Sequence, residues 1–109
     1  MVIAVDFDDT LVEKLPFPQI NYTLKKDAKE VITSLASKGV IFVLHTARYG
    51  WWRLPAIYYI KKQKLPIKIK YINRKIRADL YIDDKNYPKQ EINWKKIEKY
   101  VEGLINEKN

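Results

Sequence analysis

The 109-residue sequence contains no cysteine, one histidine, three glycines and one methionine. The absence of cysteine excludes a disulfide framework and a thiolate-bound metal site. No apolar stretch reaches the length that a membrane-spanning helix requires, and the first apolar run is typical of a core strand rather than a signal peptide. Length and composition therefore predict a single domain over residues 1–109 that can bury its own core, and we expect a cytoplasmic protein.

Strand-like and helix-like segments alternate along the chain. Short apolar runs rich in β-branched residues predict four strands, at 2–5, 40–44, 67–72 and 80–82. Helical spacing of apolar residues predicts three helices, over 25–38, from about 54 to 64, and after Asn93 as the N-cap. Strands that alternate with helices imply a parallel sheet with right-handed crossovers, and hence an α/β fold.

Acidic residues follow the first predicted strand directly, in the order Asp6-Phe7-Asp8-Asp9-Thr10. The end of this strand would hold Asp6 and Asp8 close together, where their charges repel unless a cation neutralises them. A carboxylate can attack phosphorus as a nucleophile, and a second carboxyl group nearby can donate and accept protons. The pattern therefore favours a metal-dependent catalytic site over a simple acidic turn.

The spacing of Asp6, Asp8 and Thr10 resembles the first motif of the haloacid dehalogenase (HAD) superfamily of aspartyl-phosphate phosphatases. The resemblance implies that Asp6 is the nucleophile. Asp8 would protonate the leaving oxygen and then act as the base that activates water. Thr10 would help to fix the turn and is assigned to substrate binding. Asp9 stands where many relatives have glycine, a departure that changes no catalytic role.

Two later segments resemble the second and third motifs of the same family. Thr46 follows the strand predicted at 40–44 and matches the residue that hydrogen-bonds the transferring phosphoryl group. Lys75 is our choice for the cation of the third motif, which offsets the negative charge on nucleophile and phosphate. Arg74 and Arg77 are competitors for that role.

The fourth motif is matched by Asp83 and Asp84, which follow the strand predicted at 80–82. With Asp6 and Asp8, these residues would form an oxygen-only Mg²⁺ site. Magnesium would then bridge nucleophile and phosphate and orient the attack. Ligands bind at the carboxyl edge of open α/β sheets, and the motifs follow one another in the order that places them there.

The intervals between the motifs leave no room for a cap domain. Residues 11–24 suffice for a short flap, and the interval from Thr46 to Lys75 holds a helix and a strand. The resemblance therefore implies a capless, Rossmann-like HAD fold with three α/β/α layers and a central, mainly parallel sheet. An open site favours a macromolecular substrate, or shielding by another subunit in a homo-oligomer.

Basic residues dominate the sequence, with 21 Lys and Arg against 13 acids and a net charge of +8. Basic and aromatic residues interleave after Thr46, and from this loop we assign four residues to substrate binding: Arg48, Trp51, Trp52 and Arg53. Guanidinium groups bind phosphate and indoles stack on bases. The alternative is that the indoles cover the edge of the core. His45 should point away from Thr46 by strand alternation and is expected to have a packing role.

These observations predict a Mg²⁺-dependent phosphohydrolase that forms an aspartyl-phosphate intermediate on a nucleic-acid end or another large phosphorylated substrate. The paired acids and capless build also resemble the phosphatase domain of polynucleotide kinase-phosphatases, which removes 3′ phosphates. Two alternatives stay open. One is a non-catalytic nucleic-acid-binding module on the same fold. The other is a small-metabolite or nucleotide phosphatase shielded by oligomerisation.

Overall fold

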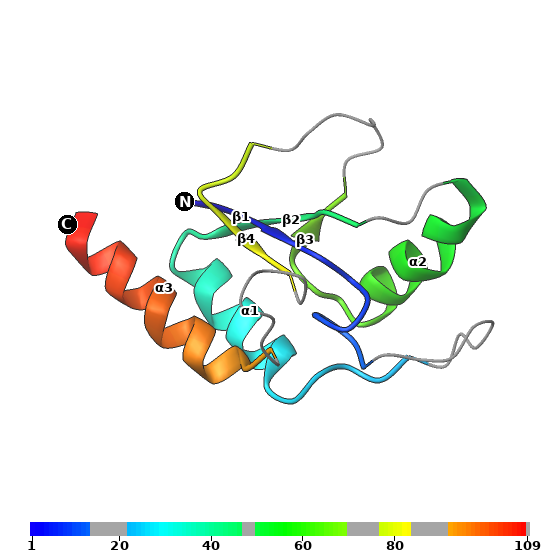
Figure 1. Ribbon diagram of the computed structural model, residues 1–109, viewed down its shortest axis with the longest axis horizontal. Coiled ribbons are helices and arrows are strands. Elements are labelled where there is room, and N and C mark those ends of the chain that lie inside the picture. The colour runs from blue at the N-terminus through cyan, green and yellow to red at the C-terminus, as the bar shows by residue number, and fades with distance from the viewer. Residues whose placement is uncertain (14–21, 47–49, 70–76, 84–91, 109) are drawn as a thin grey trace.

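The protein is a four-stranded parallel sheet covered by helices, described by a computed structural model over residues 1–13, 22–46, 50–69, 77–83 and 92–108 (Figure 1). The strands are β1 (Val2–Val5), β2 (Ile41–Leu44), β3 (Ile67–Lys68) and β4 (Leu80–Ile82). The helices are α1 (Ala28–Ser37), α2 (Leu54–Lys62), α3 (Trp94–Lys108) and the short 3₁₀ helix η1 (Gly50–Arg53). The strand order is β3-β2-β1-β4 with every pairing parallel, which makes the fold a Rossmann-like α/β fold.

The predicted elements are all present, with shifted ends that have local causes. Helix α1 starts at Ala28 instead of residue 25 because Asp27 has a left-handed backbone, with φ of 66°. Helix α2 ends at Lys62, and Lys64 is left-handed with φ of 55°. Asn93 caps α3 as predicted, since its Oδ1 accepts a hydrogen bond from the backbone N–H of Lys96 at 3.1 Å.

The strand predicted over residues 67–72 is shorter than expected. Only Ile67 and Lys68 pair with β2, and Ile69 already lies outside the strand. Residues 70–72 lie outside the described part of the chain. The alternation of apolar and polar residues thus predicted the position of β3 and not its length.

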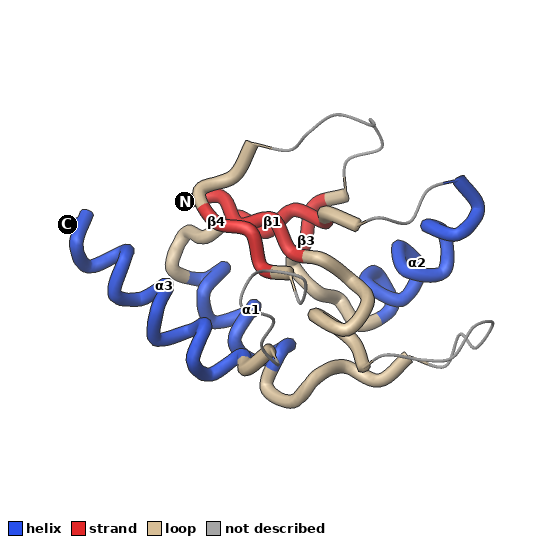
Figure 2. Tube along the Cα trace, viewed as in Figure 1, coloured by secondary structure: helices blue, strands red, loops and turns tan. Residues whose placement is uncertain are grey.

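The hydrophobic core lies between the three helices and one face of the sheet. Val5, which pairs with both neighbouring strands, belongs to one buried cluster that also contains Val31 of α1, Ile57 of α2 and Val101 of α3. Figure 2 shows the three helices on the same side of the sheet. The expected three-layer arrangement is therefore two layers in the described residues, because no helix in that part of the chain covers the second face.

The second face carries a contact across the central strand. Ala4 is in register with Val43 on one side and with Tyr81 on the other, and Ala4 is fully buried. The rings of His45 and Tyr81 meet edge to face, with centroids 5.7 Å apart. The small side chain of Ala4 leaves room for this contact above β1. His45 therefore has a packing contact, as predicted.

Candidate active site at the carboxyl edge of the sheet

Asp6 leaves the sheet between the ends of its two neighbouring strands. Its backbone N–H donates to the carbonyl oxygen of Ile82 at 3.0 Å, which carries the pairing of β1 with β4 past the last strand residue. This pairing brings Asp83 beside Asp6. Thr46 follows Leu44, the last residue of β2, after one intervening position. Since adjacent strands lie about 4.8 Å apart, the three predicted site residues share one edge of the sheet.

The Asp6 carboxylate is largely withdrawn from water, with 8% of the residue exposed. Its Oδ1 accepts a hydrogen bond from the backbone N–H of Phe7 at 2.8 Å. Asp8 and Asp83 are half-buried. A carboxylate this poorly hydrated requires hydrogen-bond donors or a cation to remain charged. In the described ranges no three His, Cys, Asp or Glu side chains are grouped so that they could hold a metal, and Asp84 lies outside those ranges.

The turn after Asp6 is organised by one carbonyl group. The carbonyl oxygen of Phe7 accepts hydrogen bonds from the N–H groups of Thr10, Leu11 and Val12, at 3.5, 3.1 and 3.2 Å. Asp9 within this turn is left-handed, with φ of 57°. Glycine adopts this conformation most easily and aspartate tolerates it better than most residues. Aspartate can therefore occupy this position of the turn, although glycine would adopt the conformation more easily.

A buried lysine stabilises this turn. No pattern in the sequence indicated it. The Nζ of Lys25 lies 3.2 Å from Asp9 Oδ1 and 3.6 Å from Glu13 Oε2, while Lys25 itself is 8% exposed. Burial alone would lower the pKa of Lys25, but the hydrogen bonds and charges of Asp9 and Glu13 outweigh it and raise the pKa. The backbone N–H of Lys25 also donates to Leu11 at 2.9 Å. Lys25 therefore joins the segment before α1 to the turn at residues 7–12, which we call the aspartate turn.

Thr10 is fully buried, and its carbonyl oxygen accepts a hydrogen bond from the indole of Trp94 at 3.0 Å. Trp94 is 1% exposed and is the first residue of α3. This placement suits the expected role of Thr10 in fixing the turn and argues against direct contact with a substrate. No spacing in the sequence indicated the role of Trp94.

The loop after Thr46 separates into an exposed and a half-buried part. Trp51 in η1 is 86% exposed, so its indole does not cover the core. Trp52 and Arg53 are half-buried. Arg48 lies outside the described residues, as do Lys75 and Arg74, so the structure leaves their predicted roles as predictions.

Arg77 lies at the opposite edge of the sheet. The N–H of Asp79 donates to Val2 at 2.8 Å, and the N–H of Val2 donates to the Asp79 carboxylate at 2.7 Å. These bonds fix the chain near Arg77 at the amino end of β1, where the rise of the strand separates Val2 from Asp6 by about 13 Å. Arg77 is therefore poorly located for the third-motif cation.

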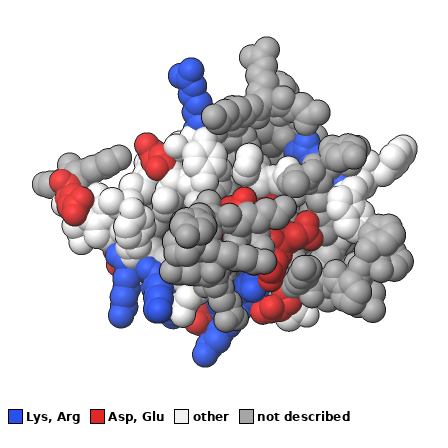
Figure 3. All heavy atoms as spheres, viewed as in Figure 1, with Lys and Arg blue, Asp and Glu red and all other residues white. Residues whose placement is uncertain are grey.

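The described Lys and Arg side chains do not form one patch on the face seen in Figure 3. There the described Lys and Arg side chains stand at several separate places around the outline, with acidic side chains between them. Positive charge on this face would attract a polyanion from solution without marking where it binds.

The fold is shared with a protein of known structure. The chain is similar to a conserved protein coded by a locus of Bacteroides thetaiotaomicron, with 27% sequence identity and a TM-score of 0.79. The similarity covers 95% of this chain and 91% of that protein's chain. No protein-family model matches the chain, and no curated protein matches it. In the described residues no helix is long and apolar enough to cross a membrane. The fold and the edge residues define a small Rossmann-like α/β protein with carboxylates at the carboxyl edge of its sheet.

Proposed function

We propose that the protein is a Mg²⁺-dependent phosphohydrolase of the HAD type. The observation that carries this proposal is the common location of Asp6, Thr46 and Asp83 at one edge of the sheet. These residues come from three distant segments, and the strand order puts Asp6 between the other two. A nucleophile, a hydroxyl donor and a metal-binding carboxylate are the parts that phosphoryl transfer through an aspartate requires.

The reaction would proceed in two displacements at phosphorus. A carboxylate oxygen of Asp6 attacks the phosphorus of a monoester, the bond to the ester oxygen breaks, and Asp8 gives its proton to that oxygen. Asp8 then takes a proton from water as the water oxygen attacks the aspartyl phosphate. The bond from phosphorus to Asp6 breaks, and inorganic phosphate leaves. Thr46 would donate a hydrogen bond to a phosphoryl oxygen during both steps.

The residues at this edge suit Mg²⁺. Asp6 and Asp83 offer only oxygen donors, with the main-chain carbonyl of Asp8 as a third ligand and Asp84 as a further candidate. Asp6 is 8% exposed and has the half-buried Asp83 as its neighbour, so a cation between them would relieve the repulsion of the two carboxylates. When bound, Mg²⁺ would neutralise charge on the nucleophile and on the phosphate.

The substrate class that we propose is a nucleic-acid end or another large phosphorylated molecule. In the described part of the interval between β2 and β3 there are only η1 and α2, so no cap is seen there. The exposed indole of Trp51 follows the end of β2 on the chain and is available for stacking on a base.

The test combines a substrate screen with a nucleophile variant. Wild-type protein with Mg²⁺ is assayed on phosphorylated compounds that include 3′- and 5′-phosphorylated oligonucleotides, and acid-quenched samples are searched by mass spectrometry for phosphoryl-Asp6. Asp6→Asn should lower kcat by at least about 10³-fold, because an amide cannot accept the phosphoryl group. Asp27→Asn is the matched control, since Asp27 makes no side-chain cap on α1 and asparagine tolerates its left-handed backbone. Full activity of folded Asp6→Asn would exclude the covalent mechanism.

A further inference from the structure

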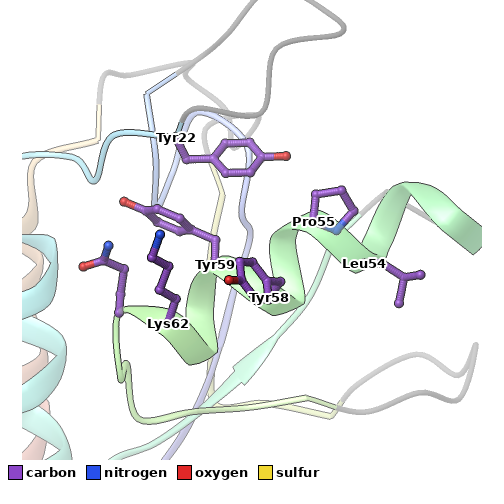
Figure 4. A pocket seen from close by; sticks show the side chains of 7 residues that line it. Tyr22, Leu54, Pro55, Tyr58, Tyr59 and Lys62 are labelled. Carbon is purple, nitrogen blue, oxygen red and sulfur yellow. The ribbon is translucent and has the colours of Figure 1, made fainter.

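A pocket of about 670 Å³ lies along α2. Six of the residues that line it are Tyr22, Leu54, Tyr58, Tyr59, Lys62 and Gln63. Figure 4 shows Tyr22 on one side of the pocket and the side chains of α2 on the other. Small-molecule sites in proteins typically have volumes of about 300–1,000 Å³, so this pocket can hold a nucleobase with its sugar.

The aromatic wall of the pocket is held in place before any ligand binds. The rings of Tyr22 and Tyr59 meet edge to face with centroids 5.3 Å apart, and the buried ring of Phe7 contacts them at 5.0 and 6.3 Å. Burial raises the pKa of Tyr59, although a hydrogen bond from the backbone of Leu24 acts in the opposite direction. A wall fixed in this way loses little conformational entropy when a flat ring packs against it.

The pocket is joined to the candidate active site in two ways. Phe7, which packs on its wall, directly follows Asp6 and organises the aspartate turn. Leu54 lines the pocket and is the first residue of α2, and η1 directly precedes it on the chain, after β2. Figure 1 shows the start of α2 on the side toward which the strands of the sheet point. A ligand in the pocket can therefore extend toward the edge that carries Asp6.

Two exposed apolar side chains of α2 line the pocket: Leu54 and Tyr58, which are 51% and 69% exposed and lie one helical turn apart. Lys62 lies one further turn along α2 and lines the same pocket. Trp51 of η1, which is 86% exposed, precedes them on the chain and is not part of the pocket lining. Proteins that bind single-stranded nucleic acids combine aromatic faces for the bases with cations for the phosphates. The tyrosine hydroxyls and the amide of Gln63 add polar groups that can bond to the edge of a base.

We propose that this pocket binds the nucleobase of a phosphorylated nucleoside, with Tyr58 stacked on the base. Where that nucleoside is the end of a strand, Lys62 lies near a backbone phosphate of the strand. The proposal deepens the proposed function, because it rests on Asp6 as the site of the terminal phosphate. Two sources share this chemistry: a mononucleotide, and the last nucleotide of a single strand. The net charge of +8 favours either anionic ligand over a neutral aromatic compound.

The first experiment measures binding without turnover. In the Asp6→Asn background, Tyr58→Ala is compared with Tyr100→Ala, a control on α3 that is 59% exposed and does not line the pocket. Fluorescence titrations use nucleoside monophosphates and short 3′- or 5′-phosphorylated single strands. Tyr58→Ala should raise Kd by roughly 5- to 100-fold, which is the loss of one base stack, while Tyr100→Ala should change Kd by less than about twofold. Tight binding of strands and not of monophosphates would identify a strand end as the source.

The cation is tested in the same assay by its salt dependence. Lys62→Gln should weaken binding of the phosphorylated strands and reduce the slope of log K against log salt by about one unit. Lys99→Gln on α3 is the matched control and should leave the slope unchanged. Equal slopes in the two variants would contradict the contact between Lys62 and the backbone.

The second experiment separates this inference from the phosphohydrolase proposal. Hydrolysis of acetyl phosphate, which has no ring, is compared with hydrolysis of the nucleotide, and Tyr58→Ala should lower the ratio of nucleotide to acetyl phosphate kcat/KM by at least about fivefold. Binding that depends on Tyr58 without any hydrolysis would support the pocket and reject the phosphohydrolase. If the protein hydrolyses phosphate esters but Tyr58→Ala and Tyr100→Ala bind the nucleotide equally well, the proposed base-binding role of the pocket is wrong. It is also wrong if the wild-type protein binds no nucleotide. A dimer that Tyr58→Ala dissociates, with nucleotide binding unchanged, would overturn it in favour of a second copy of the chain.

Discussion

The indole Nε1 of Trp94 donates a hydrogen bond to the carbonyl oxygen of Thr10 at 3.0 Å, across 84 residues of sequence. Both residues are almost fully buried. The bond attaches the start of the last helix to the turn that carries Asp6 and Asp8. The side chain of Trp94 therefore couples the start of α3 to the geometry of the candidate active site.

Trp94→Phe should destabilise the protein more than its loss of volume suggests. Phenylalanine cannot donate the hydrogen bond, so the carbonyl of Thr10 stays buried without this donor, and we expect a loss of about 2–3 kcal/mol in the free energy of unfolding. Urea denaturation measures the change. Trp51→Phe is the control, because Trp51 is 86% exposed and its replacement should cost less than about 0.5 kcal/mol. Equal stability of the two variants would mean that the hydrogen bond contributes little.

Lys25→Met should lower the free energy of unfolding, because it removes the ion pairs of Lys25 with Asp9 and Glu13. We expect a loss of about 1–2 kcal/mol, less than for a fully buried pair, because the Asp9 and Glu13 side chains are 34% and 54% exposed. The folded pKa of Lys25 is raised above 10.5, so the stabilisation is fully present below pH 10.5 and is lost as the pH rises through the folded pKa. The stability difference between wild type and Lys25→Met should therefore be constant from neutral pH to about pH 10 and shrink above it. Lys26→Met, at an exposed neighbour, should show no such profile.

A second substitution tests whether Lys25 acts through the carboxylate of Asp9, which lies 3.2 Å from its Nζ. Glycine adopts the left-handed conformation of that position without a charged side chain to neutralise. Asp9→Gly should therefore recover part of the stability that Lys25→Met loses, and a thermodynamic cycle of the four proteins measures the coupling. Strictly additive effects would show that Lys25 and Asp9 act independently.

Metal removal should abolish hydrolysis, and Asp83 should set the metal requirement. Treatment with EDTA is expected to stop turnover, and added Mg²⁺ to restore it. Asp83→Ala removes a charged oxygen ligand, so the Mg²⁺ concentration for half-maximal activity should rise by at least about tenfold. Asp27→Asn should keep the wild-type requirement. An Asp83→Ala protein with an unchanged Mg²⁺ dependence would place the metal elsewhere.

The two tryptophans of η1 should behave differently when each is replaced by alanine. Trp51 is 86% exposed, so Trp51→Ala should leave the melting temperature unchanged and raise KM for a nucleic-acid substrate by roughly 5- to 100-fold. Trp52 is half-buried, and Trp52→Ala should lower the melting temperature. Calorimetry and steady-state kinetics on both variants check this division. A destabilised Trp51→Ala would assign a structural role to that indole as well.

The local parts of the fold were predictable because each follows from neighbouring residues. The β-branched run before Asp6 predicts a buried strand, and β1 has the predicted bounds of Val2–Val5. Asn93 predicts the start of α3 because its side chain can bond to the helix backbone. The common edge of Asp6, Thr46 and Asp83 follows from the parallel order of the strands, which alternation with helices implies.

The remaining features depend on contacts that no local pattern encodes. The spacing of apolar residues predicts that a helix has an apolar face, but it does not indicate which face of the sheet the helix covers. The location of the three helices on one side was therefore not predictable. Lys25 belongs to a Lys-Lys-Asp sequence that is typical of a solvated helix start, and its burial depends on Asp9 and Glu13. Trp94 bonds to Thr10 across 84 residues, a separation that no local pattern spans.

The sheet narrows from its centre to its margins in the part of the chain that the structure describes. Strands β1 and β2 have four residues each, while the outer strands β4 and β3 have three and two. An outer strand this short presents very few backbone groups to an incoming chain, which is one way in which proteins avoid uncontrolled strand addition and aggregation. The described outer strands therefore offer little backbone for another chain to extend the sheet.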